Sequence, residues 1–424
     1  MGGKSEMSSI PKGYKKTEVG VIPEDWGMKK LGDFSSFQNG IGFPIRYQGK
    51  QHGDLPFCKV SDMNLTGNEV FITRANNYIS YEEARIIHSP IVSPNSILFA
   101  KVGAALLLNR RRITKCKICI DNNMMSLEPD PCVNLYFIYQ KLTTIDFADY
   151  AQEGALPSIN SSQISKISIP LPTLSEQNAI AEVLSDMDAL IEAQKELIAK
   201  KREIKQGTMQ DLLSGRVRLP GYETKGWKHT DIGDIPGDWE VKSFSNIAYL
   251  IKETVDPTSN KSLNCVELEH LSSSTGLLID FDDLLDKSSF KNKFQRGDVL
   301  FGKLRSYLRK FWLCQWSGCC STEIWVFRPK SITNSVFLKY IVSSDQFVKV
   351  ASESFGTHMP RADWNVVKEC FFAIPALYSE QQAIAQVLSD MDDELETLEA
   401  ELEKLNHMKR GMMQELLTGR IRLI

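Results

Sequence analysis

One long segment of this chain is present twice, and that duplication limits the possible folds more than any other feature. Ser175–Leu219 recurs as Ser379–Leu423 at a constant offset of 204 residues, without a gap. The first copy opens on SEQNAIAEVLSDMD and the second on SEQQAIAQVLSDMD, which differ at two positions. They close on GTMQDLLSGRVRL and GMMQELLTGRIRL. The chain is therefore expected to fold as two related halves that end in the same element.

Each copy predicts one long helix. The preceding phrases, ISIPLPTLSEQ and FAIPALYSEQ, carry prolines that end a strand before the helix starts. Ser379 has the S-x-x-Q spacing of a capping box, and Ser175 is expected to cap the first helix. Gly215 and Gly419 stand where a C-terminal helix glycine is expected. At 1.5 Å per residue each helix would be about 57 Å long, more than a compact domain accommodates.

The apolar residues of these helices follow alternating spacings of three and four, the pattern of a coiled-coil seam. In the second copy the seam is Leu388, Met391, Leu395, Leu398, Leu402 and Leu405, and in the first it is Leu184, Met187, Ile191 and Ile198. Gln194 and Lys201 occupy the two remaining seam positions of the first copy. We expect the two helices to pair as an antiparallel coiled coil in which Lys201 meets glutamates of the second helix. The alternative is that each helix lies separately on its own domain.

The remainder of each half predicts a β-rich domain. The halves open on TEVGVIPEDW and TDIGDIPGDW, in which Trp26 and Trp239 are expected to be packing anchors. Short β-branched and aromatic runs between turn residues then favour strands. The predicted fold is α+β. Two β-rich α/β domains, related by an internal pseudo-twofold repeat, are expected at opposite ends of the helical pair. Its parts are residues 1–173 (first domain), 174–219 (first helix), 220–377 (second domain) and 378–424 (second helix).

Basic residues follow equivalent strands in the two domains. SILFAKVGA at Ser96 aligns with DVLFGKLRS at Asp298, and GALPSIN at Gly154 aligns with THMPRAD at Thr357. Arginine and lysine side chains position nucleic-acid phosphates and read base edges. The DNA-binding candidates are Lys101, Arg110, Arg111, Arg112, Lys115, Lys303, Arg305, Tyr307, Arg309, Lys310 and Arg361. One basic strand is commonly just a solvated face, but its recurrence in both domains favours a nucleic-acid surface.

Composition excludes several other classes. The 424 residues are 42% hydrophobic and 24% charged, which is typical of globular chains. The N-terminus lacks the apolar core of a signal peptide, and no apolar run is long enough for a membrane span, so a cytoplasmic protein is expected. The nine cysteines are scattered, which fits reduced thiols, and no metal site is expected. Phosphate-binding loops, zinc-protease motifs and dinucleotide fingerprints are missing, so no catalytic residue is predicted.

These motifs together resemble the specificity subunit of type I restriction-modification systems. The resemblance rests on IPEDW and IPGDW, on GDVLFGKLRSYLRK, on both IAxVLSDMD helices and on both exits, and it covers the chain from Tyr14 onward. It implies that each domain reads one half of a bipartite, asymmetric DNA site, and that the helices set the spacer and dock other subunits. The DNA target itself is not legible from the sequence.

The resemblance also implies partners. These are double-stranded DNA, two modification subunits carrying the methyltransferase site, and restriction subunits carrying nuclease and translocase activities. S-adenosylmethionine, ATP and Mg²⁺ would be bound by those subunits, with no cofactor in this chain. Two alternatives stay open: the specificity subunit of a related system whose methylase and nuclease are fused, and a two-headed interaction scaffold that binds no DNA.

Overall fold

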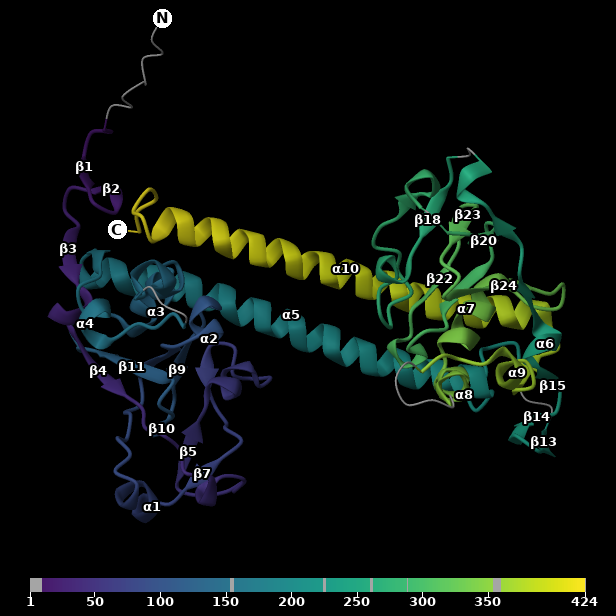
Figure 1. The fold of residues 1–424 in the computed structure, drawn as a ribbon, viewed down its shortest axis with the longest axis horizontal. Coiled ribbons are helices and arrows are strands. Elements are labelled where there is room, and N and C mark those ends of the chain that lie inside the picture. The colour runs from purple at the N-terminus through teal and green to yellow at the C-terminus, as the bar shows by residue number, and fades with distance from the viewer. Residues whose placement is uncertain are drawn as a thin grey trace, which may run out of the picture. The chain divides into compact units, whose positions relative to one another are not determined.

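The fold was analysed in a computed structural model that describes residues 10–152, 156–223, 226–259, 262–287, 289–353 and 360–423. The chain divides into two compact units, of which the first combines residues 1–194 with 402–424 and the second comprises residues 195–401. Each unit contains one β-rich domain and parts of two long helices, α5 (Leu174–Ser214) and α10 (Tyr378–Leu416) (Figure 1). The protein therefore has two repeated domains of mixed helix and sheet, together with two long helices.

Domain 1, in the first unit, is built around a five-stranded sheet in the order β4-β11-β8-β9-β6, with a smaller sheet in the order β10-β5-β7. Its strands are β1 (Tyr14–Thr17), β2 (Gly20–Pro23), β3 (Gly27–Lys30), β4 (Ser35–Asn39), β5 (Leu55–Cys58), β6 (Phe71–Ile72), β7 (Tyr78–Ile79), β8 (Ile97–Ala100), β9 (Arg111–Thr114), β10 (Cys119–Ile120), β11 (Met124–Pro129) and β12 (Ser168–Leu171). Its short helices are α1 (Tyr81–Ile86), α2 (Ala104–Leu107), α3 (Leu135–Thr143) and α4 (Ser161–Ile164).

Domain 2, in the second unit, repeats this plan with a four-stranded sheet in the order β16-β24-β21-β22 and a five-stranded sheet in the order β17-β20-β23-β18-β19. Its strands are β13 (Trp227–Thr230), β14 (Gly233–Pro236), β15 (Trp239–Ser243), β16 (Ala248–Ile251), β17 (Thr254–Val255), β18 (Asn264–Val266), β19 (Asp282–Asp283), β20 (Lys291–Phe294), β21 (Val299–Gly302), β22 (Phe311–Leu313), β23 (Gly318–Cys320), β24 (Ile324–Pro329) and β25 (Phe371–Pro375). Its helices are α6 (Phe244–Ile247), α7 (Ser335–Ser343), α8 (Asp345–Ser352) and α9 (Trp364–Val367).

The core of each domain includes side chains from both long helices. Ile180 and Leu184 of α5 join Leu416 of α10 in the core of domain 1. Met209 and Leu212 of α5 join Ile384 and Leu388 of α10 in the core of domain 2. The apolar face of a helix is buried by the element that it packs against, so neither helix belongs to one domain alone.

The starts of the long helices differ from the predicted capping boxes. Both helices begin one residue before the predicted caps Ser175 and Ser379, which lie in the first helical turn. The glutamine of the predicted box, Gln382, is exposed, whereas the residue before it, Gln381, is buried. Gln381 donates from Nε2 to the carbonyl oxygen of Pro375 (3.1 Å) and accepts from the backbone N–H of Asn334 (3.0 Å). It therefore ties α10 to the start of α7 rather than capping its own helix.

The helix ends and the opening phrases meet in a repeated arrangement, here called the exit knot. In unit 2, the guanidinium of Arg218 binds Glu380 (2.6 and 2.9 Å) and Asp238 (2.9 and 3.1 Å), and the indole of Trp239 donates to Glu380 (3.3 Å). Unit 1 repeats the knot with Arg422 on Glu176 (2.6 and 2.9 Å) and Asp25 (3.0 and 2.8 Å), and with Trp26 on Glu176 (3.0 Å).

Both tryptophans are fully buried, which confirms the prediction that they anchor packing. Gly215 and Gly419 have φ of +72° and lie against them, and a Cβ added at either glycine would approach a proline ring to 2.5 Å. Glycine is therefore required there for both its backbone angle and its size.

A second repeated contact, the aspartate knot, joins each domain to both helices. In unit 1, Asp188 of α5 accepts from Tyr136 Oη (2.6 Å), Gln140 Nε2 (2.7 Å) and Lys409 Nζ of α10 (2.6 Å). In unit 2, Asp392 of α10 accepts from Tyr340 Oη (2.7 Å), Lys339 Nζ (2.9 Å) and Lys205 Nζ of α5. Within each unit the helical segments run antiparallel. In unit 1, Glu176 contacts Arg422 and the later residue Asp188 contacts the earlier residue Lys409. In unit 2, Lys205 contacts Asp392 and the later residue Arg218 contacts the earlier residue Glu380.

Lys141 of α3 is expected to make the folded chain more stable as the pH rises into the alkaline range. Its Nζ donates to the carbonyl oxygen of Leu417 (3.0 Å), and burial lowers its pKa to about 8. Between about pH 8 and pH 10.5 the unfolded chain therefore binds more protons than the folded chain, and stability rises with pH. Urea unfolding should show a rise of about 3 kcal/mol across this window in the stability of the wild type relative to Lys141→Met. Lys166→Met, at an exposed position, serves as the control and should keep the rise. An identical rise in Lys141→Met would contradict this assignment.

Candidate nucleic-acid interface

In domain 2 three separate segments interlock through backbone hydrogen bonds just after strand β21. Lys303 donates its N–H to the carbonyl oxygen of Glu323 (3.0 Å), Arg305 donates to Pro360 (2.9 Å) and Ala362 donates to Lys303 (2.9 Å). Leu304 and Arg361 form a β-bridge. We name this set, residues 303–310, 321–323 and 360–362, the domain 2 loop cluster.

Domain 1 contains the same set of backbone bonds. Lys101 donates to Asn123 (2.8 Å), Gly103 donates to Pro157 (2.8 Å) and Ile159 donates to Lys101 (2.9 Å). Val102 and Ser158 form the matching bridge. The domain 1 loop cluster is therefore residues 101–110, 121–123 and 157–159. The phrases GALPSIN and THMPRAD that align in the sequence lie beside the basic loops in space, although Gly154 and His358 fall outside the described residues.

The backbone of these loops includes left-handed residues at matching places. Gly103 (φ +69°) corresponds to Arg305 (φ +52°), and Asn109 (φ +50°) corresponds to Arg309 (φ +50°). Glycine and asparagine adopt this region readily, but arginine does so at a cost. Domain 2 therefore holds two arginines in a backbone conformation that glycine or asparagine would adopt with less strain. Strained backbone positions of this kind concentrate at functional sites.

The side chains of the domain 2 loop cluster include cations that have no counter-ion among the residues that the structure describes. Arg305 is exposed and Lys303 is half-buried, and neither makes a side-chain hydrogen bond or ion pair with any described residue. Tyr307 is 55% exposed beside them. Arg361 is exposed and donates from Nη2 to Glu323 Oε1 (3.1 Å). The structure thus brings four of the predicted residues together.

Two other predicted residues of this loop have local partners. Arg309 forms an ion pair with Asp345 and donates to the carbonyl oxygen of Ser343 (3.3 Å). Lys310 Nζ donates to the carbonyl oxygen of Leu268 (2.7 Å). The contacts of Arg309 hold it to the start of α8, and the hydrogen bond of Lys310 holds it to the loop that follows β18. Both side chains brace the loop in this structure.

The predicted residues of domain 1 are more engaged. Lys101 Nζ donates to Asn39 Oδ1 (2.7 Å), and burial lowers its pKa. Arg110 donates to Asn64, and Arg112 donates to the carbonyl oxygen of Met63 (2.9 Å). Lys115 is exposed, with its ammonium 4.4 Å from the centre of the Phe71 ring. The shared set of backbone hydrogen bonds in the two loop clusters is here called the backbone lattice. Of the five domain 1 candidates, which include Arg111, Lys101 takes part in the bonds named above.

Arg111, one of the predicted DNA-binding residues, is buried rather than exposed at the surface of domain 1. Its side chain is buried at 2% exposure, with the guanidinium 3.7 Å from the Phe147 ring centre and a hydrogen bond to the carbonyl oxygen of Arg110 (3.0 Å). Burial lowers the pKa of this guanidinium. The same place in domain 2 is occupied by Phe311, which is 4% exposed. Side chains alternate along a strand, so Arg111 shares a face with Ile113, which is buried. This alternation was the sequence signal that could have indicated the burial of Arg111.

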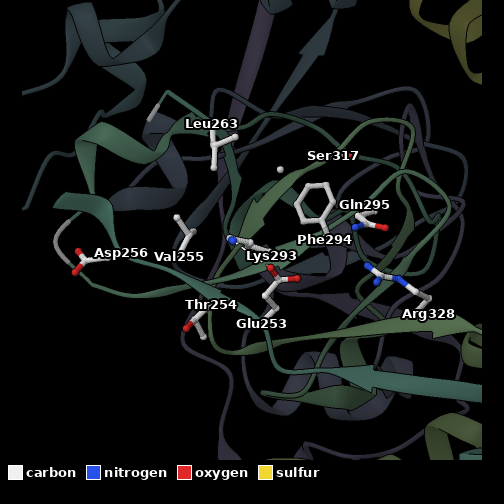
Figure 2. A pocket seen from close by; sticks show the side chains of 11 residues that line it. Glu253, Thr254, Val255, Asp256, Leu263, Lys293, Phe294, Gln295, Ser317 and Arg328 are labelled. Carbon is white, nitrogen blue, oxygen red and sulfur yellow. Dashed lines mark hydrogen bonds and ion pairs between the residues drawn. The ribbon is translucent and has the colours of Figure 1, made fainter. Parts of the chain in front are cut away.

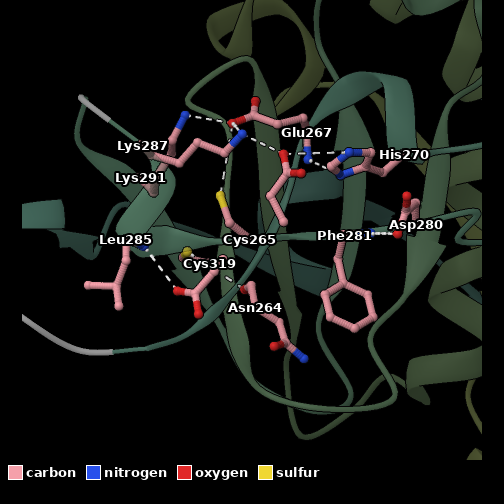
Figure 3. A network of polar contacts seen from close by, with 12 residues as sticks. Asn264, Cys265, Glu267, His270, Asp280, Phe281, Leu285, Lys287, Lys291 and Cys319 are labelled. Carbon is pink, nitrogen blue, oxygen red and sulfur yellow. Dashed lines mark hydrogen bonds and ion pairs between the residues drawn. The ribbon is translucent and has the colours of Figure 1, made fainter. Parts of the chain in front are cut away.

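Other lysines near β20 are neutralised by carboxylates. Lys291 is 6% exposed and donates to Glu267 (2.7 Å), and Lys287 pairs with Asp282 (Figure 3). Lys293 pairs with Glu253 (3.1 Å) at the wall of a pocket of about 460 Å³ (Figure 2). Arg328, also on that wall, is held by Asp298 (2.8 Å). The cations of this pocket are thus already paired, unlike Lys303 and Arg305.

The predicted seam residues lie on the more buried face of the long helices. Five of them are at most 9% exposed: Leu184, Ile191, Ile198, Leu388 and Leu395. The other five, Met187, Met391, Leu398, Leu402 and Leu405, are half-buried. Lys201 forms an ion pair with Glu394 (2.5 Å), as expected for a lysine facing the glutamates of the second helix.

Sequence reasoning missed the acidic and amide members of the loop clusters. Glu323 and Asn123 immediately precede the equivalent strands β24 and β11, and Ser158 is the counterpart of Arg361. The only sequence signal was the alignment of the flanking strands and loops. Across the described residues, no three His, Cys, Asp or Glu side chains come together as a possible metal site. A membrane-spanning helix is likewise not found in the part of the chain that the structure describes.

The fold and the loop clusters define a class: duplicated proteins whose two β-rich domains present variable side chains on one common backbone lattice, each domain tied to paired helical segments. The chain belongs to the type I restriction modification DNA specificity domain family, whose model matches residues 23–201 and again 236–407. The two matched stretches correspond to the two repeated halves.

Relatives of known name agree in length. The MjaVIII type I restriction enzyme specificity subunit of Methanocaldococcus jannaschii is 26% identical over 435 residues, covering 95% of this chain and 94% of that protein. The EcoDI specificity subunit of Escherichia coli is 22% identical over 295 residues, covering 63% and 65%. Among solved structures, the type I restriction-modification S subunit of M. genitalium has a similar fold, with a TM-score of 0.54 at 14% identity and coverage of 95% and 97%.

Proposed function

We propose that this chain is the DNA-reading specificity subunit of a type I restriction-modification complex, in which each domain reads one half of a bipartite, asymmetric site. One observation carries the proposal. A single backbone lattice occurs in both domains, and it presents different side chains in each. A shared frame with variable side chains suits a protein that recognises two unlike half-sites in one geometry. Lys101 and Lys303, identical in both frames, would contact phosphates.

The long helices would form an antiparallel coiled coil that sets the spacer between the half-sites. The ion pairs Lys201–Glu394 and Arg202–Glu399 support this pairing in unit 2, and Lys409–Asp188 supports it in unit 1. The aspartate knots would hold each domain in a fixed orientation on the pair. A rigid helical pair then acts as a ruler along the DNA, where one turn is about 34 Å.

The chain would itself be non-catalytic and cytoplasmic. Two modification subunits would dock on the helices and bring S-adenosylmethionine chemistry to the DNA, and restriction subunits would bring ATP, Mg²⁺ and nuclease activity. Catalytic groups from such subunits would act where the specificity subunit has positioned the duplex.

Binding and methylation experiments test the DNA-reading role directly. The purified complex with its modification subunit should shift duplex DNA, with an affinity that falls steeply as salt rises because phosphate contacts release counter-ions. Single-molecule methylation sequencing should then give one motif made of two half-sites and an unspecified spacer. A complex that binds no DNA would leave the interaction scaffold as the better description. The sequence of the co-purified partner distinguishes separate from fused methylase and nuclease.

Lengthening both helices should lengthen the spacer. We would insert seven residues after Glu196 and seven after Ala400, which are repeat-equivalent positions (400 minus 196 is 204). Seven residues add about 10 Å and nearly preserve the helix face. The ion pairs within each unit lie on one side of both insertions and stay in register. We expect unchanged half-sites with a spacer about three base pairs longer, since successive base pairs are about 3.4 Å apart.

A matched control carries the insertion in α5 alone. It should disrupt pairing in the helices and weaken methylation at every site rather than shift the spacer. Altered half-sites with the original spacer in the double insertion would rule out the ruler.

A further inference from the structure

Four pairs of positions in the lattice carry a charged or amide side chain in at least one domain, and of these one is shared and three are variable. Lysine occupies the first position in both domains, as Lys101 and Lys303. The other pairs are Gly103 and Arg305, Asn123 and Glu323, and Ser158 and Arg361. In a protein that reads two unlike half-sites, a shared group suits positioning of the duplex, and the groups that specify bases are expected among the differing ones. The variable positions of domain 2 are therefore the place to look for base readout.

Arg361 and Glu323 occupy two of these variable positions and contact each other. Arg361 donates through Nη2 alone to Glu323 Oε1 (3.1 Å), so the other N–H groups of its fork have no partner among the described residues. The side chain of Arg361 is 57% exposed and that of Glu323 is 26% exposed. A carboxylate that fixes one edge of a guanidinium orients the remaining donors, which favours bidentate recognition.

Glu323 also distinguishes base readout from phosphate binding. A carboxylate placed against the DNA backbone would meet phosphates of like charge, which is unfavourable. In the major groove the same carboxylate accepts from the N4 amino group of cytosine, while arginine donates to O6 and N7 of guanine. The second oxygen of Glu323 is buried and accepts no hydrogen bond from a described residue. Because this oxygen is buried and the other accepts from Arg361, the role of Glu323 in this structure is to orient Arg361.

We propose that Arg361, oriented by Glu323, reads a guanine in the half-site recognised by domain 2. This rests on the proposed DNA-reading function and makes it specific at one base pair. Arg305, exposed on the same cluster and without an adjacent carboxylate, contacts phosphate instead. The corresponding domain 1 positions, Asn123 and Ser158, carry no charge, so domain 1 reads its half-site with different chemistry.

The test measures methylation of a randomised duplex library by the complex of the full chain with its modification subunit. The wild type should give a bipartite motif with at least one G·C pair in a position that becomes degenerate in Arg361→Ala. Loss of one bidentate contact corresponds to about 5- to 150-fold in discrimination. Arg361→Lys should recover only part of it, because an ammonium is not a bidentate donor. Glu323→Gln should reduce discrimination at the same base pair and nowhere else.

Arg305→Gly is the matched control, since glycine occupies this left-handed position in domain 1. It should lower methylation of all sites about equally and reduce the salt dependence of binding by about one phosphate contact, without changing the motif. A gain-of-function variant places the same pair of side chains in domain 1 through Asn123→Glu and Ser158→Arg. This double substitution should introduce a G·C preference in the other half-site.

Several outcomes overturn the proposal. They are an unchanged motif in Arg361→Ala, a uniform loss like that of Arg305→Gly, or a change spread over both half-sites. Arg361 is exposed, so its removal should leave the stability close to that of the wild type and the variant should fold. If the wild-type complex itself produces no motif, the DNA-reading function fails rather than the assignment of this base pair.

Discussion

Replacing Arg218 by methionine is expected to destabilise unit 2 by about 3–5 kcal/mol, because it removes one partner from a buried ion pair. The side chains of Arg218 and Glu380 are 6% and 2% exposed. Methionine fills similar space but leaves the carboxylate of Glu380 with only the indole N–H of Trp239 (3.3 Å). Denaturant unfolding at pH 8 should report this loss as a lower midpoint.

The same variant should show a characteristic pH dependence. Burial raises the pKa of Glu380, and Arg218 opposes that rise in the wild type. Without the guanidinium the pKa of Glu380 should rise further, so above pH 4.5 the folded variant binds more protons than its unfolded chain and loses stability as pH increases. The destabilisation relative to wild type should therefore be smaller at pH 5 than at pH 8.

Arg216→Met is the control for the exit knot. Arg216 pairs with Asp211 at the surface, with side-chain exposures of 62% and 42%. Exposed pairs contribute at most about 1 kcal/mol, so this variant should remain close to wild type. Equal losses for the two variants, or a loss in Arg218→Met that does not vary with pH, would show that the exit knot does not stabilise unit 2.

The second large effect is expected at the aspartate knot. Asp392→Ala leaves two ammonium groups, Lys205 and Lys339, without their shared counter-ion, and their side chains are only 17% and 14% exposed. Tyr340 loses its acceptor as well. Hydrogen bonds to charged groups contribute about 1.5–3 kcal/mol each, so a combined loss of about 3 kcal/mol is expected. Glu394→Ala, on the same helix, removes a carboxylate that is 46% exposed and should cost under about 1 kcal/mol.

Acid titration adds an independent measurement. Burial opposes ionisation of Asp392, but Lys339 and Lys205 outweigh it and the pKa of Asp392 is lowered. The knot's contribution is thus present above pH 3.8 and is lost as pH falls through the lowered value. Wild type and Asp392→Ala should therefore converge in stability in strong acid. A constant difference between them down to pH 2 would argue against the charge of Asp392 as the stabilising group.

The prediction of the fold succeeded where local pattern decides structure. Leu395 and Ile198 lie at seam spacing and are buried because helical period alone sets which face they occupy. Gly215 follows its helix with the positive φ that its position indicated. The predicted caps Ser175 and Ser379 lie inside their helices, because each helix begins one residue earlier than the local pattern indicated. The burial of Arg111 was not expected, because its charge was considered without the alternation of side chains along the strand.

Only part of the candidate site could be predicted from the sequence. Lys303, Arg305 and Tyr307 belong to one continuous loop, so their composition could be read from the sequence. Their closeness to Arg361 and Glu323 depends on three segments that are hydrogen-bonded across the fold. Glu323 gave no signal, because a single carboxylate before a strand is ordinary. Its role became apparent only through the guanidinium beside it.

By itself the sequence determined that this protein has two related halves, each with a β-rich domain and a long helix. A repeat at a constant offset and regular apolar spacing are local, periodic information. Only the tertiary structure decided where each exit segment goes: Arg218 closes on Trp239 of domain 2, and Arg422 closes on Trp26 of domain 1. Both arginines follow helices of nearly the same sequence, so the choice of partner is set by packing between distant residues.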